Sequence, residues 1–268
     1  MKKILILIFL ILPLFIQAQN VDEVNGVALT NLSEIDGVPV ANIAEINGVP
    51  LVISTLKTDL VSVWEFNETS GTNADDAHGS NDGTYTLSYS LSQSSVTNLS
   101  NAVSFFSGYV QVTNNITGYA TNGLSIGCWF KASELNSTHK FFMVKRTSGT
   151  VSCFQFYRNK NSDVFLHIGT SDYANFGAPS FTTDTWYHVV VTYDKSNVKL
   201  YVNGSLFSTV AKTTAIPETD VDTYIGTDSG GNYSAMTVDQ PFIFGRAISL
   251  EEIQEKYASG NGKAFINW

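Results

Sequence analysis

Hydrophobic and polar positions alternate with a period of two over short stretches of the chain from Leu60 onward. Gly, Asn, Asp and Ser interrupt these stretches about every eight to twelve residues, a spacing typical of antiparallel sandwiches and barrels. The pattern predicts strands at Val61–Phe66, Ala102–Phe106, Tyr109–Val112, Leu124–Lys131, Phe141–Lys145, Ser152–Tyr157, Val164–Ile168, Trp186–Tyr193, Val198–Val202, Leu206–Val210 and Met236–Phe244.

Local signals add one tight hairpin and one helix to this pattern. Asn203-Gly204 stands between two β-rich runs, which predicts a two-residue hairpin turn. Leu250–Ala258 is helical in pattern, with Ser249 as the N-cap and Glu252 completing a capping box. The chain is therefore expected to be mostly sheet with one short C-terminal helix.

The first nineteen residues, MKKILILIFLILPLFIQAQ, have the pattern of a secretory signal peptide. Two lysines precede an apolar run that is shorter than the roughly 20 residues of a membrane-spanning helix. No later segment approaches that length. We expect a secreted or extracytoplasmic protein, in the periplasm or on the cell surface, that spans no membrane after cleavage.

Residues 23–53 contain an eleven-residue repeat whose copies begin at Glu23, Glu34 and Glu45. Each copy has Asn-Gly or Asp-Gly between short β-branched runs, the composition of a tight turn between two strands. Each copy is thus predicted to be a strand–turn–strand fragment. Such a fragment cannot bury its own apolar face, which implies stacking or a partner chain.

Two roles remain open for the repeat. Pro39 and Pro50 argue against central positions in a sheet. One interpretation makes residues 20–56 a semi-rigid stalk or linker. The other makes residues 23–53 a self-assembling segment through which the chain forms a homo-oligomer.

The charge of the chain excludes one class of partner. The chain has 15 Lys and Arg against 24 Asp and Glu, a net charge of −9, and no basic cluster. Nucleic acid is excluded as a partner, because phosphate binding needs Lys and Arg patches.

The two cysteines leave two alternatives. Cys128 and Cys153 each fall in a predicted strand, so they either form a disulfide with each other or remain as two buried free thiols.

Five segments in order resemble laminin G-like domains of the concanavalin A-like lectin and glucanase family, in its bacterial secreted type. They are LVSVWEFNETSGTNADDAHGSNDGT, AVSFFSGYVQV, LSIGCWFK, TWYHVVVTYDKSNVKLYVNGSLFSTV and MTVDQPFIFGRAISLEEIQEKYA. The resemblance covers residues 60–258 and implies an all-β domain at 57–268. That domain would be a jelly roll of two antiparallel sheets packed face to face, with the repeat segment before it.

The resemblance also suggests a structural Ca²⁺ ion. In related jelly rolls such an ion joins the early acidic loop to an aspartate on the last strand, which here implies Asp76, Asp82 and Asp239 as ligands. Calcium binds six to eight oxygen atoms of this kind. The alternative is a solvated turn in which Asp and Asn supply only turn geometry.

Aromatic residues in small polar loops are the candidates for ligand contact. Tyr173 and Phe176 lie in GTSDYANFGAPS, and Tyr233 lies in GTDSGGNYSAM. Exposed rings of this kind present flat apolar faces to a sugar, while neighbouring amides bind its hydroxyl groups. The alternative is that the rings anchor long loops to the sandwich. The tryptophans in predicted strands, Trp64, Trp129 and Trp186, are expected in the core.

Known catalytic patterns are missing from the chain. Glucanases of this fold carry Glu-x-Asp-x-x-Glu on one strand, so that alternation points the three carboxylates into a cleft. Glu34-Ile35-Asp36 begins that pattern, but Pro39 occupies the third position. The four histidines are scattered without metal-ligand spacing, and His188 is expected to be structural.

We therefore predict a non-catalytic, secreted binding or adhesion module that recognises carbohydrate or a cell-surface protein. The alternative is a structural assembly protein, a surface fibre or a phage virion decoration or tail component, that oligomerises through the repeats. A glycoside hydrolase is disfavoured by the missing carboxylates.

Overall fold

The computed structural model describes residues 54–113, 116–120, 122–147, 150–169 and 171–268, together with six two-residue strands nearer the N-terminus. The chain divides into two compact units, Met1–Lys57 and Thr58–Trp268. Residues 1–22, with the predicted signal peptide, lie outside the described residues, so that prediction stays open.

The N-terminal unit contains three short hairpins with one common register. Each is an antiparallel pair of two-residue strands: β1 (Glu23–Val24) with β2 (Val27–Ala28), β3 (Glu34–Ile35) with β4 (Val38–Pro39), and β5 (Glu45–Ile46) with β6 (Val49–Pro50). The glutamate that opens each copy pairs with the residue five positions later. The two paired strands predicted for each copy are present, and the residues of the predicted turns lie outside the described residues.

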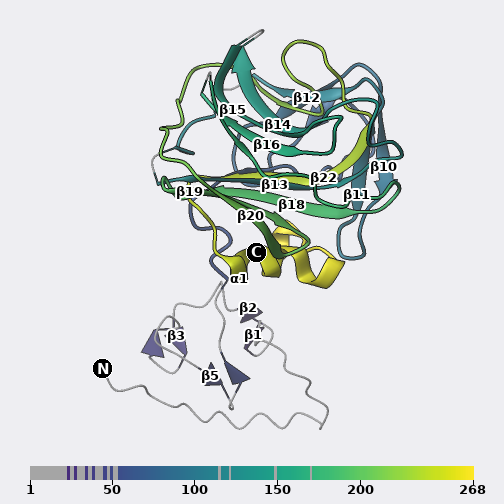
Figure 1. Cartoon of the computed structure of the whole chain (residues 1–268). Coiled ribbons are helices and arrows are strands. Elements are labelled where there is room, and N and C mark those ends of the chain that lie inside the picture. Colours follow the sequence, from purple (N-terminus) through teal and green to yellow (C-terminus); the bar gives the residue numbers. More distant parts are fainter. Residues whose placement is uncertain are drawn as a thin grey trace. The chain divides into compact units, whose positions relative to one another are not determined.

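The second unit is a sandwich of two eight-stranded antiparallel sheets (Figure 1). In the first sheet the strands follow the order β10 (Tyr89–Ser94), β11 (Asn101–Phe105), β22 (Met236–Phe244), β13 (Leu124–Lys131), β18 (Tyr187–Tyr193), β19 (Asn197–Val202) and β20 (Ser205–Ala211). The eighth strand, β7 (Leu60–Val63), also pairs with β22. Because α1 lies on its outer side, we call this the covered sheet.

The second sheet is called the open sheet below. Its order is β17 (Asp172–Asn175), β16 (Val164–Ile168), β15 (Thr150–Arg158), β14 (Lys140–Thr147), β21 (Thr223–Ile225), β12 (Tyr109–Val112), β9 (Gly83–Thr86) and β8 (Asn73–Ala74). Every predicted strand is present in one of the two sheets. The all-β, two-sheet jelly-roll class predicted from the sequence is confirmed.

The hydrophobic core lies between the sheets. Val189, Val191 and Tyr193 of β18 point into it, as alternation predicts. Val190 lies on the opposite face yet is fully buried. A strand covered on both faces has no need of strict alternation.

Helix α1 (Leu250–Tyr257) begins with the predicted capping box, because the Ser249 hydroxyl accepts from the Glu252 amide and Glu252 accepts in return. The same carboxylate receives two hydrogen bonds from Arg246, at 2.7 and 2.5 Å. The helix stops at Ala258, which adopts a left-handed conformation. No helix among the described residues is long and apolar enough to cross a membrane.

The C-terminal segment folds back beside α1. Its two short 3₁₀ turns are η3 (Ala258–Gly260) and η4 (Phe265–Asn267). Trp268 is 2% exposed and stacks on Phe244 of β22, while Nζ of Lys256 lies 3.1 Å from the centre of its indole ring. The segment therefore adds to the layer that covers the first sheet.

The two cysteines are free and buried. Cys128 lies on β13 of the covered sheet and Cys153 on β15 of the open sheet. The structure has both thiols unbridged, so the free-thiol alternative is correct.

Candidate functional site

The outer faces of the two sheets differ in accessibility. On the covered sheet, Tyr257 of α1 stacks on Trp129 and Lys256 lies over Phe242. Figure 1 shows α1 on the side of this sheet that faces away from the open sheet. None of the described helices packs on the open sheet, but side chains near the middle of its outer face are covered: Phe141, Val144 and Gln155 are 2%, 0% and 6% exposed.

Strand register arranges the outer side chains of the open sheet in two rows across the strands. In β16 the alternation sends Val164, Leu166 and Ile168 into the core and Phe165 and His167 outward. Register then aligns one row as Asn175, Phe165, Tyr157 and Phe141. The second row runs Tyr173, His167, Gln155, Val144, Tyr224 and Gln111.

Ring stacking joins several of these side chains near β16. Tyr157 stacks on Phe165 with ring centres 5.4 Å apart, and His167 stacks on Tyr173 at the same 5.4 Å. His139 lies almost parallel to Tyr157, at 5.7 Å. We call Phe165, His167, Tyr173, Tyr157 and His139 the β16 cluster. Its rings hold one another in place and leave Tyr173 half exposed.

A second group, the tyrosine cluster, consists of Tyr109, Tyr224 and Tyr233. Tyr109 stacks on Tyr233 with ring centres 6.1 Å apart and planes 13° from parallel, and Tyr224 lies at 6.1 Å from Tyr109. The Tyr224 hydroxyl donates to Asp222, which also accepts from the Gln111 amide at 2.6 Å. The cluster therefore combines flat ring faces with fixed polar groups.

Polar side chains lie between the two clusters. Nη1 of Arg146 donates to Gln155 at 2.7 Å and lies 3.8 Å from Oδ2 of Asp228. Asp228 also accepts from the backbone amides of Gly230 and Asn232. These groups fix the loop that carries Tyr233 against the middle of the open sheet.

The two histidines of the β16 cluster are held in their neutral forms. Burial lowers the pKa of His167, and the positive charge of Arg146 lowers it further. Burial, followed by the charge of Lys160, also lowers the pKa of His139. Near neutral pH both rings are therefore uncharged and act as aromatic surface.

Of the three predicted contact residues, two are on this face. Tyr173 is 50% exposed on β17, and Tyr233 is partly exposed beside Tyr109. Phe176 is only 5% exposed and packs in the main core, so its prediction as a contact residue is wrong. Its backbone amide bonds to the Val164 carbonyl, and its ring anchors the loop, the alternative considered from the sequence.

The predicted calcium ligands occupy two places. Asp76 is buried in the early loop, where it accepts backbone N–H groups from Val63, His78 and Asn81, and Asp82 accepts from the amide of Asp76. Asp239 lies on β22 and accepts from the Ser95 hydroxyl. The described residues contain no group of three or more His, Cys, Asp or Glu able to hold a metal. Calcium stays a prediction.

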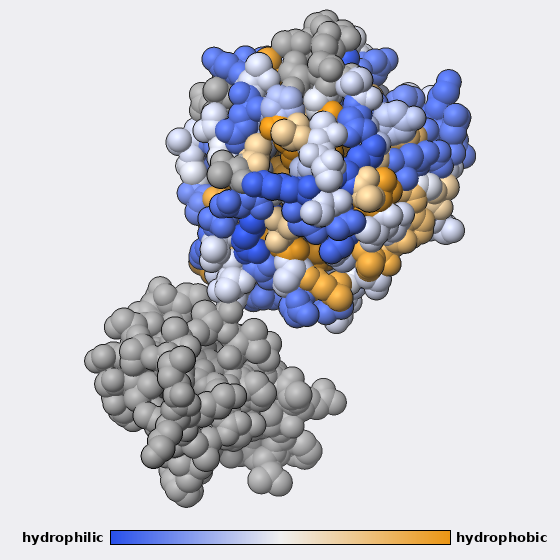
Figure 2. All heavy atoms as spheres, turned by 60° about the vertical axis from the view of Figure 1, so that its left-hand side comes forward, coloured by the Kyte–Doolittle hydropathy of each residue, from blue (hydrophilic) through white to orange (hydrophobic). Residues whose placement is uncertain are grey.

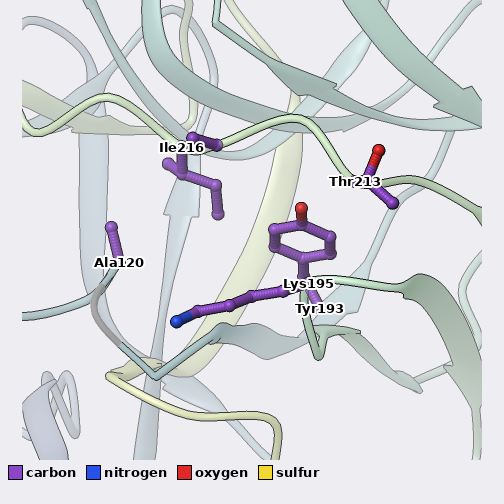
Figure 3. A pocket seen from close by; sticks show the side chains of 6 residues that line it. Ala120, Tyr193, Lys195, Thr213 and Ile216 are labelled. Carbon is purple, nitrogen blue, oxygen red and sulfur yellow. The ribbon is translucent and has the colours of Figure 1, made fainter.

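A small pocket lies away from both clusters, between the β18–β19 turn and the segment that follows β20. It has a volume of about 230 Å³ and is lined by Ala120, Tyr193, Lys195, Thr213, Ala215 and Ile216. Figure 3 shows the Lys195 side chain extending beneath Ile216. Ligand pockets usually measure about 300–1,000 Å³, so this pocket is smaller than the usual ligand site.

The exposed surface otherwise offers no single dominant patch in the view of Figure 2, where hydrophilic residues predominate and apolar residues form small separate groups. On the face drawn in Figure 2, a ligand site therefore has to be recognised from the arrangement of side chains. The ordered rows of the open sheet supply that arrangement.

A family profile matches the sequence that forms most of the two sheets and the C-terminal helix. The profile of the concanavalin A-like lectin/glucanases superfamily matches residues 104–254, more than half of the chain. The chain belongs to this superfamily. A search of curated proteins gave no match for this superfamily member.

Solved structures of the same fold include parts of larger proteins. Trypanosoma rangeli sialidase matches with a TM-score of 0.56 and 16% identity over 86% of this chain and 36% of its own. Domain 4 of AbnA, a GH43 extracellular arabinanase from Geobacillus stearothermophilus, was solved in complex with arabinotriose. It matches with a TM-score of 0.57 and 15% identity over 74% of this chain and 97% of its own. The binding domain of botulinum neurotoxin DC, in complex with rat synaptotagmin II, matches with a TM-score of 0.55 and 14% identity. This match covers 76% of this chain and 52% of the neurotoxin chain.

These likenesses, all below 20% identity, show the fold alone. The chain spans about a third of the sialidase and about half of the neurotoxin fragment. Activities and partners of those whole proteins are therefore not transferred to this chain by the comparison.

Proposed function

We propose that the sandwich is a non-catalytic carbohydrate-binding module that uses the outer face of the open sheet. The observation that carries the proposal is the set of aromatic rings, aligned by strand register, on the face that no described helix covers. Sugars stack on such ring faces, and fixed amide and carboxylate groups bind their hydroxyls. A superfamily with lectin members and a fold neighbour in complex with arabinotriose support this choice.

The absence of catalysis is part of the proposal. Glu34-Ile35, the start of the glucanase-like pattern, forms strand β3 in the N-terminal unit, and Pro39 pairs with Glu34 there. The acidic residues near the clusters are engaged: Asp222 accepts from Gln111 and Tyr224, and Asp228 from its own loop. A protein receptor, as in the neurotoxin–synaptotagmin II complex, is the alternative partner class.

A glycan array with residues 57–268, run with calcium and with EDTA, tests the proposal. We expect binding that Tyr173→Ala abolishes or weakens strongly. Phe207→Ala is the matched control, because Phe207 is 43% exposed on β20 of the covered sheet. Absence of binding on the array, or equal loss in both variants, contradicts the proposal. A requirement for calcium would support the predicted ion.

A second candidate function rests on the N-terminal unit. Its three hairpins share one register, and an isolated two-stranded hairpin is at best marginally stable in water. Stacking of such hairpins between chains would make the protein a surface assembly component. Light scattering on residues 20–268 and on residues 57–268 tests this, and equal monomer masses would contradict it.

We also propose that the protein is exported, and this rests only on the signal-peptide pattern of residues 1–19. Expression of the full chain in a secreting bacterial host, followed by mass spectrometry of the secreted protein, would locate the cleavage site. Retention of residues 1–19 in the recovered protein would contradict this part of the proposal.

A further inference from the structure

We propose that the pocket beside the β18–β19 turn is a second ligand site, which binds a short-chain monocarboxylate with Lys195 as the charged anchor. The pocket lies away from the aromatic clusters of the open sheet. The inference therefore goes beyond the proposed carbohydrate binding, and each of the two can fail without the other.

The first argument is the size of the pocket. Its volume is about 230 Å³. A water molecule takes up about 30 Å³ in the liquid, so the pocket has room for roughly seven or eight non-hydrogen atoms. A short-chain carboxylic acid fits this volume, whereas a sugar ring with its hydroxyl groups exceeds it.

The second argument is the apolar floor of the pocket. Tyr193 is 2% exposed and Ile216 is 7% exposed, and both line the pocket together with Ala120. In Figure 3 the aliphatic stem of Lys195 crosses the pocket below Ile216, and its nitrogen lies on the side of Ala120. A short hydrocarbon chain can contact the methyl groups and the tyrosine ring while its carboxylate reaches the lysine.

The third argument is charge. Among the described residues that line the pocket, Lys195 alone carries a charge, and it has no ion pair within the described part of the chain. Acidic side chains nearby have partners of their own: Asp194 lies 3.8 Å from Lys199, and Asp172 lies 2.5 Å from Lys212. One free ammonium group matches one carboxylate, and a charge-assisted hydrogen bond between them is among the stronger kinds.

The fourth argument is that the walls of the pocket are already fixed. The Tyr193 hydroxyl donates to the Thr214 carbonyl oxygen at 2.7 Å, which ties the floor to the segment after β20. The Ala120 amide donates to the Glu218 carboxylate at 3.0 Å, which ties the opposite wall to the same segment. A ligand that enters a fixed pocket loses little affinity to the ordering of protein groups.

The fifth argument is the backbone of Lys195 itself. Its φ of 70° is left-handed, a conformation that glycine and asparagine adopt at lower cost. The Asp194 carboxylate holds the turn by accepting the amides of Ser196 and Asn197, at 2.9 and 2.7 Å. A lysine at such a position indicates a use for its side chain, and the side chain lines the pocket.

The test is a titration of the full chain with butyrate, followed by NMR of isoleucine methyl groups. The methyl signal of Ile216, identified by its loss in Ile216→Val, reports from the pocket. We expect a saturable shift with a dissociation constant of about 1 mM, in the range open to a ligand of so few atoms. Butyramide has the same shape without the charge and should bind about tenfold more weakly.

The variant Lys195→Gln keeps most of the stem and removes the charge, so it should weaken butyrate binding by about tenfold. Lys160→Gln is the matched control, because Lys160 is an exposed lysine outside the pocket, and it should leave the affinity unchanged. The unbound spectrum of each variant checks that it still folds.

Four results would overturn the inference. They are the absence of a saturable shift at Ile216, equal affinity for butyrate and butyramide, an equal effect of the two lysine variants, and an equal shift with sodium chloride at the same concentration. The last result would mean that any anion binds. None of the four bears on the glycan array, so failure of this site and failure of the proposed function are distinguishable.

Discussion

His188 gives the sandwich a stability that depends on pH in a calculable way. The side chain is 1% exposed on β18, and neither ring nitrogen has a hydrogen-bond partner among the described groups. Trp129 of β13, Phe242 of β22, and Tyr257 and Lys256 of α1 surround it. Burial lowers its pKa well below the usual 6.5, and the charge of Lys256 lowers it further.

The sign and size of the effect follow from proton linkage. Below pH 6.5 the unfolded chain binds a proton at His188 that the folded state does not bind, so stability falls as the pH falls. At pH 5.5, one unit below the unfolded pKa, the loss is about 1.4 kcal/mol relative to pH 8. His188→Phe keeps a ring of similar size in the same contacts and removes the titration.

The assay is urea denaturation of residues 57–268, wild type and His188→Phe, followed by circular dichroism at pH 8 and pH 5.5. Asp239 and Lys256 titrate in both proteins, so the difference in unfolding free energy between the proteins isolates His188. We expect that difference to shift by about 1.4 kcal/mol in favour of the variant at pH 5.5. A difference that stays constant between the two pH values would refute the reasoning.

Three further predictions concern packing, capping and thiols. Gly127→Ala should destabilise the domain by about 1–3 kcal/mol in urea denaturation. The added methyl group would lie 2.5 Å from Cζ of Phe242 and 2.7 Å from the Val189 carbonyl oxygen, which is too close for both. An unchanged denaturation midpoint would contradict this packing. Glu252→Ala should cost about 3 kcal/mol, since it breaks the Arg246 pair and the capping box. The control change Gln254→Ala, at an exposed position of the same helix, should leave the denaturation midpoint in place. Cys128 and Cys153 should resist a thiol reagent in the native protein and should both react in denaturant. Both thiols are buried, and burial raises the pKa of Cys128, which lowers its reactivity further. If one thiol or none reacts after unfolding, the two cysteines form a bond that the structure lacks.

Period-two patterns predicted the long strands because those strands bury one face in a continuous core. β13, β16 and β18 fall within one residue of their predicted ends. The short strands β8, β9, β10, β17 and β21 were not predicted, because they hold few core residues and lie in polar Gly- and Ser-rich sequence. Their places depend on pairing with distant segments.

The candidate site was predictable only in part. Tyr173 and Tyr233 were recognised as aromatic residues in polar loops, but that rule also selected Phe176, which is buried. Phe165 and His167 were missed although Val164–Ile168 was correctly predicted as a strand. Their outward positions within that strand carried the signal. Which rings meet across strands depends on register, which no local pattern contains.

The pairing of β7 with β22 has a consequence for the order of folding. Ser62 lies opposite Ile243, so the first strand of the sandwich has its partner near the far end of the domain. During synthesis β7 has no partner strand until residue 244 has been made, and such distant pairing slows folding. The sandwich is therefore expected to close late, in one cooperative step, and to need protection of its early strands until then.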